Sequence, residues 1–459
     1  SQIPNKYMQP NTVSNPVLSL ARSIGKHLNG GILLMLMAAL ALVVANSSWS
    51  DEYFAFWLQP VHLQIGSFNV FNHGGHPLTL LEFINDALMV VFFFSTGMEI
   101  KREMLVGELS TVRQALLPVI AACGGMIMPV LIFAYIAYGT PGEAGMAIPM
   151  ATDIAFSLGV LALFSKRVPL NLKIFLTTFA VADDIGGILV IALFYSSHLA
   201  LEYLLWSAVI LAVLCIGNWK GVHSRWFYVG LGLIMWYLFL QSGVHATIAG
   251  VIVAFTIPAT PQEATGRFAE RLHAALKGFR VAPKEDILLD EGQVGTLREM
   301  RAASRRVVSP LQKLDANLQG AVNYFILPLF AFANAGVTVM KADGSIEYGV
   351  VSTGIILGLV IGKFVGIYSF TAISILSGLA KMPKGMDFRN LMGVSMLGGV
   401  GFTVSLFIAQ LSFADAPQLL DQAKIGVVCG TIISGILGCI ILHFVLPKEE
   451  EVRALSAAE

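Results

Sequence analysis

Two adjacent carboxylates, Asp183 and Asp184, stand near the middle of an apolar stretch that is long enough to cross a lipid bilayer. The stretch covers residues 175–192 and reads FLTTFAVADDIGGILVIA. A charged side chain at the centre of a bilayer costs about 2.5–3.5 kcal/mol even on the scale derived from insertion experiments. Two neighbouring carboxylates also repel each other, so at least one is expected to hold a proton near neutral pH. The sequence therefore indicates a pair that binds protons, a metal cation, or each in turn.

Two other apolar stretches contain polar or flexible residues at mid-length. Residues 144–164 include IPMATDIAFSLG, in which Thr152 and Asp153 follow Pro149. Residues 391–413 include MLGGVGFTVSLF, with three glycines close together. Both patterns predict helices that are interrupted inside the membrane, which is tolerated only where the free backbone groups are buried in protein or line an aqueous cavity. The alternative is that proline and glycine serve here as ordinary kink and packing residues, which are frequent in membrane helices.

The two interrupted stretches hold matching places in the chain. Each comes second in a group of three, the first group at 114–196 and the other at 349–446. This order is typical of the inverted repeats of secondary transporters, in which paired broken helices mark the binding site. Where two such helices cross, Asp153 could offset positive N-terminal ends and a bound cation could offset negative C-terminal ends.

A lysine also stands within an apolar stretch, since Lys363 lies in GLVIGKFVGIYS. A lone buried lysine would lose its proton, so we expect Lys363 to pair with one of the aspartates. The alternative is an ion pair that is kept for architecture alone.

Further ionisable residues lie near the ends of predicted spans. Glu99, Arg102 and Glu103 follow the apolar run 79–100, where they form either a regulatory cluster or a solvated helix end. His245 opens the span at 244–258. A histidine can sense pH, although a lone one is more often a satisfied polar residue.

The composition of the whole chain sets the class of protein. Only 13% of the 459 residues are charged and 56% are hydrophobic, whereas soluble domains carry about 25% charged residues. The chain is therefore expected to be an all-α polytopic membrane protein with about twelve transmembrane helices. A formal net charge of zero indicates no nucleic-acid partner. The twelve predicted spans are 30–48, 79–100, 114–137, 144–164, 171–196, 200–217, 226–241, 244–258, 320–340, 349–379, 391–413 and 423–446.

The distribution of basic residues orients these spans. Of the 29 Lys and Arg residues, all but Lys341, Lys363 and Lys424 fall on the side of the N-terminus. By the positive-inside rule, both termini are expected in the cytoplasm. The predicted divisions are a cytoplasmic segment 1–29, spans 1–8 in 30–258, a charged cytoplasmic insertion 259–318, spans 9–12 in 319–446, and a cytoplasmic tail 447–459.

Two connections are unusual. Residues 59–76 alternate apolar and polar side chains and end in turn formers, which predicts an external β-hairpin. Residues 261–318 place apolar side chains on helical faces, although Pro310 interrupts the second run. This pattern favours a helical cap on the cytoplasmic surface.

Several motifs together resemble one family, the sodium/proton antiporters of the NhaA type, over nearly all of residues 20–446. They are FINDALMVVFFFSTGMEIKRE, AIPMATDIAFSLGVLALF, the span with Asp183 and Asp184, SGVHATIAGVIVAF, ILPLFAFANAG, IGKFVGI and GGVGFTVSLFIA. The resemblance implies a bacterial inner-membrane exchanger that is electrogenic and regulated by pH. It also implies a homodimer in contact through the 59–76 hairpin, with membrane lipid around it and no cofactor.

The resemblance also implies roles for individual residues. Asp183 and Asp184 would be the central carboxylates of cation and proton exchange, and Lys363 would pair with Asp183. Thr152 and Asp153 would lie at the helix crossing, where they would join both aspartates around the transported sodium.

A regulatory cluster is implied as well. Glu99, Arg102 and Glu103 match a group tied to pH control, with Asp315 as a further acidic member and His245 as another regulatory residue. The chain departs from the family pattern just after Asp315, where Ala316 and Gln319 replace histidines.

The resulting hypothesis is exchange by competition, in which sodium or lithium displaces protons from the Asp183/Asp184 site. Carboxylate oxygens suit a small hard cation, and the sequence contains no Cys/His cluster of the kind that binds zinc or copper. A transporter rather than an enzyme is expected. Two alternatives are an intramembrane aspartyl protease that uses Asp153 and Asp183 as a dyad, and a cation channel.

Overall fold

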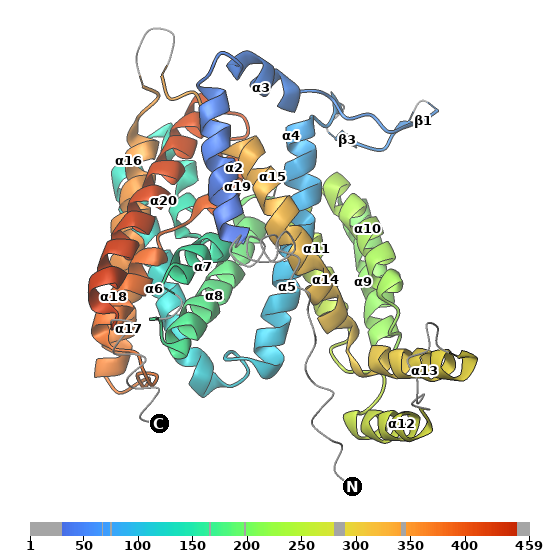
Figure 1. Cartoon of the computed structure of the whole chain (residues 1–459). Helices are drawn as coiled ribbons and strands as arrows, with labels where there is room; N and C mark the ends of the chain where they lie inside the picture. The colour runs from blue at the N-terminus through green and yellow to red at the C-terminus, as the bar shows by residue number, and fades with distance from the viewer. Residues whose placement is uncertain are drawn as a thin grey trace.

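The computed structural model describes residues 30–66, 68–73, 76–164, 167–196, 199–279, 290–340 and 346–447. The predicted N-terminal segment 1–29, nearly all of the tail 447–459 and the centre of the charged insertion lie outside the described residues. The described part is almost entirely helical, and its only strands are short (Figure 1).

Seven helical segments of the described residues are long and apolar enough to cross a membrane, or ten if each bent helix pair is counted as one span. The predicted count of twelve is therefore not confirmed, although each of the twelve stretches contains at least one helix. The seven are Leu80–Val106, Val112–Ala137 (α6), Leu170–Phe194 (α8), Leu201–Trp219 (α9), Pro310–Asn334, Val350–Leu376 and Pro417–Val445 (α20). Two further helices, α10 (Arg225–Ser242) and α11 (Thr247–Thr256), are not among them.

Three of the seven segments contain a π-helical turn, an uncommon element that is frequent at functional sites. In the first, η2 (Ile84–Leu88) lies between α4 (Leu80–Phe83) and α5 (Met89–Val106). In the second, η5 (Val322–Ile326) lies between α14 (Pro310–Ala321) and α15 (Leu327–Asn334). In the third, η6 (Gly358–Gly362) lies between α16 (Val350–Leu357) and α17 (Lys363–Leu376).

The three bent pairs include both predicted interruptions. The short helices η3 (Pro141–Gly145) and η4 (Ile148–Met150) meet α7 (Ile154–Ala162) at 47°. Helix α18 (Phe388–Leu397) meets α19 (Phe402–Ser412) at 43°. The third pair is α2 (Gly30–Ala45) and α3 (Ser50–Trp57), which meet at 116°.

Local sequence signals begin and end many of these helices. The side chain of Thr79 caps α4 in a reciprocal capping box with Glu82, and Thr111 caps α6. Asp387 caps α18 in the same reciprocal way. Helix α10 ends at Gly243, whose φ of 82° lies in the left-handed region that glycine adopts without strain.

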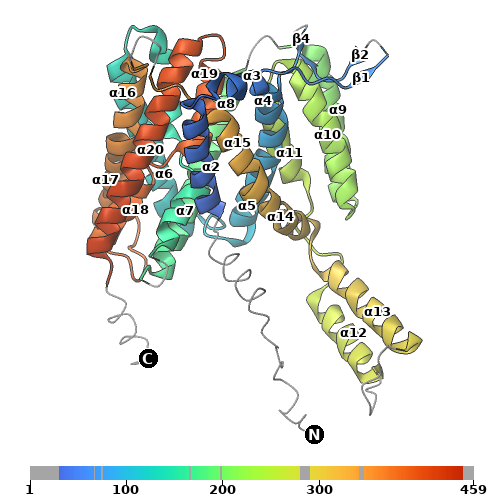
Figure 2. The ribbon, with the colours of Figure 1, turned by 45° about the horizontal axis from the view of Figure 1, so that its top comes forward.

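The short strands and the helices α12 and α13 lie at opposite ends of the molecule (Figure 1). One end, the ribbon face, carries short strands between residues 60 and 79, and the opposite end, the α12–α13 face, carries α12 (Thr265–Gly278) and α13 (Glu291–Val307) (Figure 1). Helices α9 and α10 lie at the edge of the bundle in both views (Figure 2). Helix α14 begins at Pro310, inside the predicted insertion 259–318, because Ser309 caps it and proline suits the first helical turn.

The predicted single hairpin at 59–76 is instead a ribbon with two short antiparallel ladders. Strand β1 (Gln64–Ile65) pairs with β2 (Phe68–Asn69), and β3 (Asn72–His73) pairs with β4 (His76–Pro77). A bridge between Pro60 and Thr79 closes the base of the ribbon. The alternation of side chains predicted strands correctly, but not the early turn at Gly66, which has a φ of 66°.

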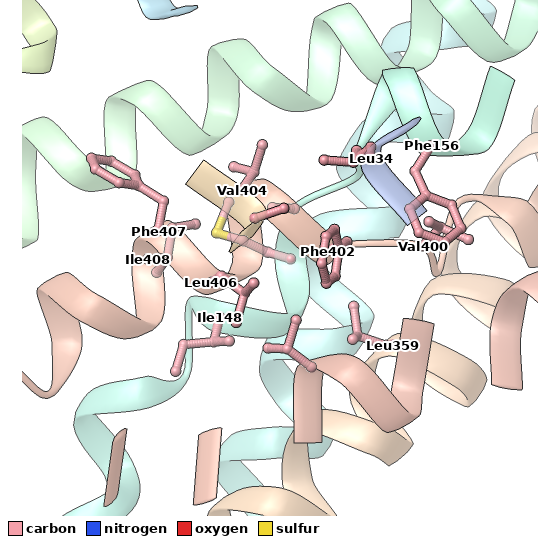
Figure 3. Close-up of a cluster of buried hydrophobic side chains, with 14 of the residues drawn as sticks. Leu34, Ile148, Phe156, Leu359, Val400, Phe402, Val404, Leu406, Phe407 and Ile408 are labelled. Atoms are coloured by element: carbon pink, nitrogen blue, oxygen red, sulfur yellow. The ribbon is translucent and has the colours of Figure 1, made fainter. Parts of the chain in front are cut away.

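The main hydrophobic core surrounds α19. Every residue from Phe402 to Ala409 is buried, as expected for a helix that is apolar on all sides and enclosed by others. Figure 3 shows Phe402 beside Val400 and Phe156, with Leu359 close to the same break. The interrupted helix α18–α19 is therefore held in protein rather than facing lipid, as an interruption in a membrane requires.

Candidate functional site

The breaks of the two interrupted helices lie against each other. The backbone N–H of Asp153 donates to the carbonyl of Val400 over 2.7 Å, and the Thr152 hydroxyl donates to the carbonyl of Gly398 over 2.8 Å. The Ser157 hydroxyl donates to the carbonyl of Leu397 over 3.1 Å. These bonds satisfy carbonyls at the end of α18 that a continuous helix would otherwise have paired.

The carboxylate of Asp153 caps two helices at once. Its Oδ1 accepts from the backbone N–H of Phe156 in α7 over 3.0 Å. Its Oδ2 accepts from both the backbone N–H and the hydroxyl of Thr403 in α19, over 3.0 and 2.5 Å. Negative charge is favourable at helix N-termini, so Asp153 offsets the positive ends of both half-helices, as expected. Both of its oxygens accept hydrogen bonds from the protein, and Asp153 also lines the cavity described below.

Asp183 and Lys363 form a buried ion pair. Lys363 Nζ lies 2.6 Å from Asp183 Oδ2, and both side chains are fully buried. Lys363 directly follows the π-helical turn η6, and Asp183 comes from the middle of α8. The predicted pairing of Lys363 with one of the two aspartates is therefore observed. The second oxygen of Asp183, Oδ1, is buried and has no hydrogen-bond partner.

Asp184 has a different environment from its neighbour. It lines a cavity of about 130 Å³ together with Thr152, Asp153 and Glu99, whereas Asp183 is not among the lining residues. The cavity has room for a few water molecules, and several of its walls are polar. Its remaining lining residues are Phe92, Ser95, Thr96, Ile154, Ala155, Leu158, Gln319, Val322, Asn323, Leu327 and Val404.

The cavity leads toward the α12–α13 face. Glu99 lies in the second half of α5, and Gln319 and Asn323 come from α14 and the η5 turn that follows it, of which α14 starts at that face. Polar residues of the cavity wall therefore extend from Asp184 toward that side. Adjacent residues on a helix point about 100° apart, which explains how one carboxylate faces the cavity while the other faces Lys363.

Four of the predicted regulatory residues meet at the mouth of this cavity. Arg102 Nη1 lies 2.9 Å from Asp315 Oδ2, and Arg102 Nη2 lies 3.6 Å from Glu99 Oε1 and 3.8 Å from Glu103 Oε1. Glu99 belongs both to this cluster and to the cavity wall, so the cluster is connected to the chamber that holds Asp184.

His245 lies elsewhere, toward the ribbon face. Its Nδ1 lies 2.8 Å from the Thr247 hydroxyl, and its Nε2 lies 3.7 Å from Asp86 Oδ1. Its ring stands edge-on to Phe407, with ring centres 5.3 Å apart. It is therefore separate from the Arg102 cluster.

Two polar residues of the site, both in α19, were not predicted from the sequence. Thr403 and Ser405 donate to the crossing from α19, and the only available signal was their position just after the glycine break.

Lys101 donates to the carbonyls of Phe255 and Ile257, over 2.7 and 2.5 Å, at the end of α11. A lysine there stabilises the negative end of the helix.

Comparison with known proteins gives a consistent result. A family model described as Na+/H+ antiporter 1 matches residues 21–442. A protein of Phocaeicola vulgatus named Na(+)/H(+) antiporter NhaA is 58% identical over 442 residues, which cover 96% of this chain and 99% of that protein. Proteins of the same name from Bacteroides fragilis and Porphyromonas gingivalis are 55% and 45% identical, each over 92% of this chain and over 97% and 94% of their own lengths. The chain therefore belongs to the Na+/H+ antiporter 1 family.

Proposed function

We propose that this protein exchanges sodium or lithium ions for protons across a membrane, and that Asp184 is the carboxylate that meets both cargoes. The observation that carries the proposal is that the two neighbouring carboxylates, Asp183 and Asp184, have different surroundings. Asp184 opens onto a polar cavity, whereas Asp183 is held by Lys363 in a fully buried pair. The relatives named Na(+)/H(+) antiporter NhaA align with this chain over nearly their whole length.

The exchange follows from competition at Asp184. A protonated Asp184 is neutral and suits the confined cavity, whereas a sodium ion needs the carboxylate oxygens. When the proton leaves, sodium takes its place. Thr152 and the part of the helix crossing that lines the cavity supply further oxygen ligands. Asp183 joins the ion once Lys363 releases it.

The charge balance of this cycle explains electrogenic exchange. With Asp184 protonated and Asp183 paired to charged Lys363, the site is neutral. With sodium bound between two ionised aspartates and with Lys363 deprotonated, the site carries one negative charge. Two protons are then exchanged for one sodium ion, and each cycle moves one charge, worth about 2.3 kcal/mol per 100 mV.

The topology and surroundings belong to the same proposal. The twelve predicted stretches would each cross the bacterial inner membrane, and the groups 114–196 and 349–446 would form two inverted repeats. Both termini and the α12–α13 face would lie in the cytoplasm. The excess of Lys and Arg on that side supports this orientation. The ribbon at 59–79 would join a second copy of the chain outside the membrane, with lipid around the pair.

Regulation by pH would act through the cluster at the cavity mouth. Glu99, Arg102, Glu103 and Asp315 lie within reach of one another, and Glu99 also faces the chamber of Asp184. Protonation of the carboxylates would free Arg102 and change the charge that an entering cation meets. His245 would act separately, from the ribbon side.

The two alternatives are less well supported. A protease dyad needs Asp153 and Asp183 to share a proton, but Asp153 is occupied by donors from two helices and Asp183 by Lys363. A channel would need an open pore through the protein and would give unitary currents in a planar bilayer.

The test is sodium-dependent proton movement in proteoliposomes of purified protein. We expect Asp184→Asn to abolish it, since the amide cannot exchange a proton in this range. A matched control is Glu202→Gln, which changes an exposed carboxylate in α9. Exchange that persisted in Asp184→Asn, or unitary currents from the wild-type protein, would refute the proposal.

A further inference from the structure

The cavity at Asp184 ends against one face of α19. Val404 lines the cavity, Phe407 is its neighbour three residues further along the helix, and Gln410 is in turn the neighbour of Phe407. Figure 3 shows Val404 and Phe407 on the opposite side of α19 from Leu406. Because α19 runs from the helix crossing toward the ribbon face, it carries a cavity wall, an aromatic ring and an amide in that order.

Phe407 lies about one helical turn beyond the cavity wall at Val404. Its side chain is fully buried, and its ring centre lies 5.4 Å from that of Phe93 in α5 and 6.4 Å from that of Phe330 in α15. On the ribbon side it meets His245. An apolar constriction of this kind excludes hydrated ions as long as its side chains stay together.

A chain of neutral amides lies next to this plug. Gln410 Nε2 donates to Asn334 Oδ1 over 3.0 Å, and Asn334 Nδ2 donates to Asn85 Oδ1 over 2.9 Å. The three residues come from α19, α15 and the π-helical turn η2, so the chain joins three helical segments. Asn85 and Asn334 are buried, and Asp86, next to Asn85, makes the contact with His245.

These amides suit a contact that must break repeatedly. A hydrogen bond between neutral groups adds little net stability, whereas hydrogen bonds to charged groups are about twice as strong. None of the three side chains changes charge with pH, so the contact does not compete with Asp184 for protons. At its other end, α19 is anchored by Asp153 at the break between residues 398 and 401, where the helix pair bends by 43°.

We propose that Phe407 and the Gln410–Asn334–Asn85 amide chain form the gate that closes the Asp184 cavity toward the ribbon face. Helix α19 tilts about the break at 398–401 to open it, which separates Gln410 from Asn334 and withdraws the ring of Phe407. The gate rests on the proposed exchange, which requires the site to face each side in turn. Within the gate, Gln410 is a positioning residue.

The first test measures access from the ribbon side. Ser95→Cys places a thiol in the cavity, in a background whose four cysteines are replaced by serine, and a membrane-impermeant charged thiosulfonate is added to right-side-out or everted vesicles. We expect Gln410→Leu to speed labelling from the ribbon side about fivefold, the shift that one neutral hydrogen bond gives. The matched control is Gln241→Leu, which removes an amide bond to the Asn72 carbonyl at the same face but outside the gate. An unchanged rate in Gln410→Leu, or an equal increase in Gln241→Leu, would overturn the gate.

The second test holds the gate shut and does not depend on a destabilised variant. Asn334→Cys and Gln410→Cys in the same background are joined by a short reducible bis-thiosulfonate, and sodium-dependent proton exchange is measured before and after reduction. We expect loss of exchange on joining and recovery on reduction. Full exchange by the joined protein would refute the gate while leaving the proposed function intact. A wild-type protein without any exchange would refute the function, whereas the labelling result would still decide the gate.

Discussion

The double cap at Asp153 gives a prediction that can be measured as an interaction energy. Asp153 Oδ2 accepts from the Thr403 hydroxyl over 2.5 Å and from the Thr403 backbone over 3.0 Å, while Oδ1 caps α7. Asparagine has one oxygen, so Asp153→Asn can cap only one of the two helices. Each hydrogen bond to a charged group contributes about 1.5–3 kcal/mol, so losing the two bonds to α19 should lower the free energy of unfolding by about 3–6 kcal/mol.

A double-mutant cycle isolates the part that belongs to the hydroxyl. Thr403→Val removes the hydroxyl and keeps the size of the side chain. In the wild-type background this change should cost about 1.5–3 kcal/mol, and in Asp153→Asn it should cost much less, so the coupling energy should be close to the first figure. The assay is unfolding by titration with SDS in mixed micelles, followed by circular dichroism.

The measured coupling energy between Asp153 and Thr403 also decides whether this prediction fails. Interhelical hydrogen bonds in a membrane protein average about 0.6 kcal/mol in such cycles. A coupling energy at or below that value would mean that the Asp153 carboxylate is not a charged cap for α19. Ser157→Ala serves as the control, because this hydroxyl also bonds across the crossing but does not contact Asp153.

Three further predictions concern the charged residues. Lys363→Met leaves Asp183 as an unpaired buried charge and should lower the free energy of unfolding by about 3–5 kcal/mol, whereas adding Asp183→Asn should restore most of that stability without restoring exchange. Glu99→Gln removes a negative charge from the wall of the cavity that holds Asp184, so the cavity should attract cations less and the half-maximal sodium concentration should rise in a dequenching assay. Lys101→Met removes the donor to the last carbonyls of α11 and should lower the free energy of unfolding by about 1.5–3 kcal/mol, with little change in the half-maximal sodium concentration.

Each of these has a contradicting result. Equal stability of Lys363→Met and the wild type would show that water reaches the Lys363–Asp183 ion pair. A half-maximal sodium concentration that stays unchanged or falls in Glu99→Gln would mean that Glu99 does not affect cation binding at Asp184. A large loss of sodium affinity in Lys101→Met would mean that this lysine takes part in transport, in addition to holding α11.

Much of the architecture could be predicted because its signals are local. Apolar runs of spanning length, the proline and glycine breaks at 149 and 398–401, and a pair of acids in an apolar stretch are all visible in a few consecutive residues. They predicted the two interrupted helices and a polar site at their crossing. Pairing of Lys363 with an aspartate followed from the energy of a lone charge in an apolar medium, which requires a partner wherever the chain provides one.

Other features depended on which helices become neighbours. Asp183 and Asp184 are equivalent in the sequence, and only the packing of α17 on one side and of α5 and α14 on the other gives one of them Lys363 and the other a cavity. The donors to Oδ2 of Asp153 both belong to Thr403, which lies 250 positions away in the chain. The turn that divides the ribbon and the amide chain from Gln410 to Asn85 were likewise not visible, since each depends on register and depth rather than on residue type.

The sequence by itself thus determined which residues are costly in a membrane, and therefore which residues need a function. Only the tertiary structure decided which partner relieves each cost, because a hydrogen bond or ion pair is set by distances of a few ångströms between helices that are far apart in the chain.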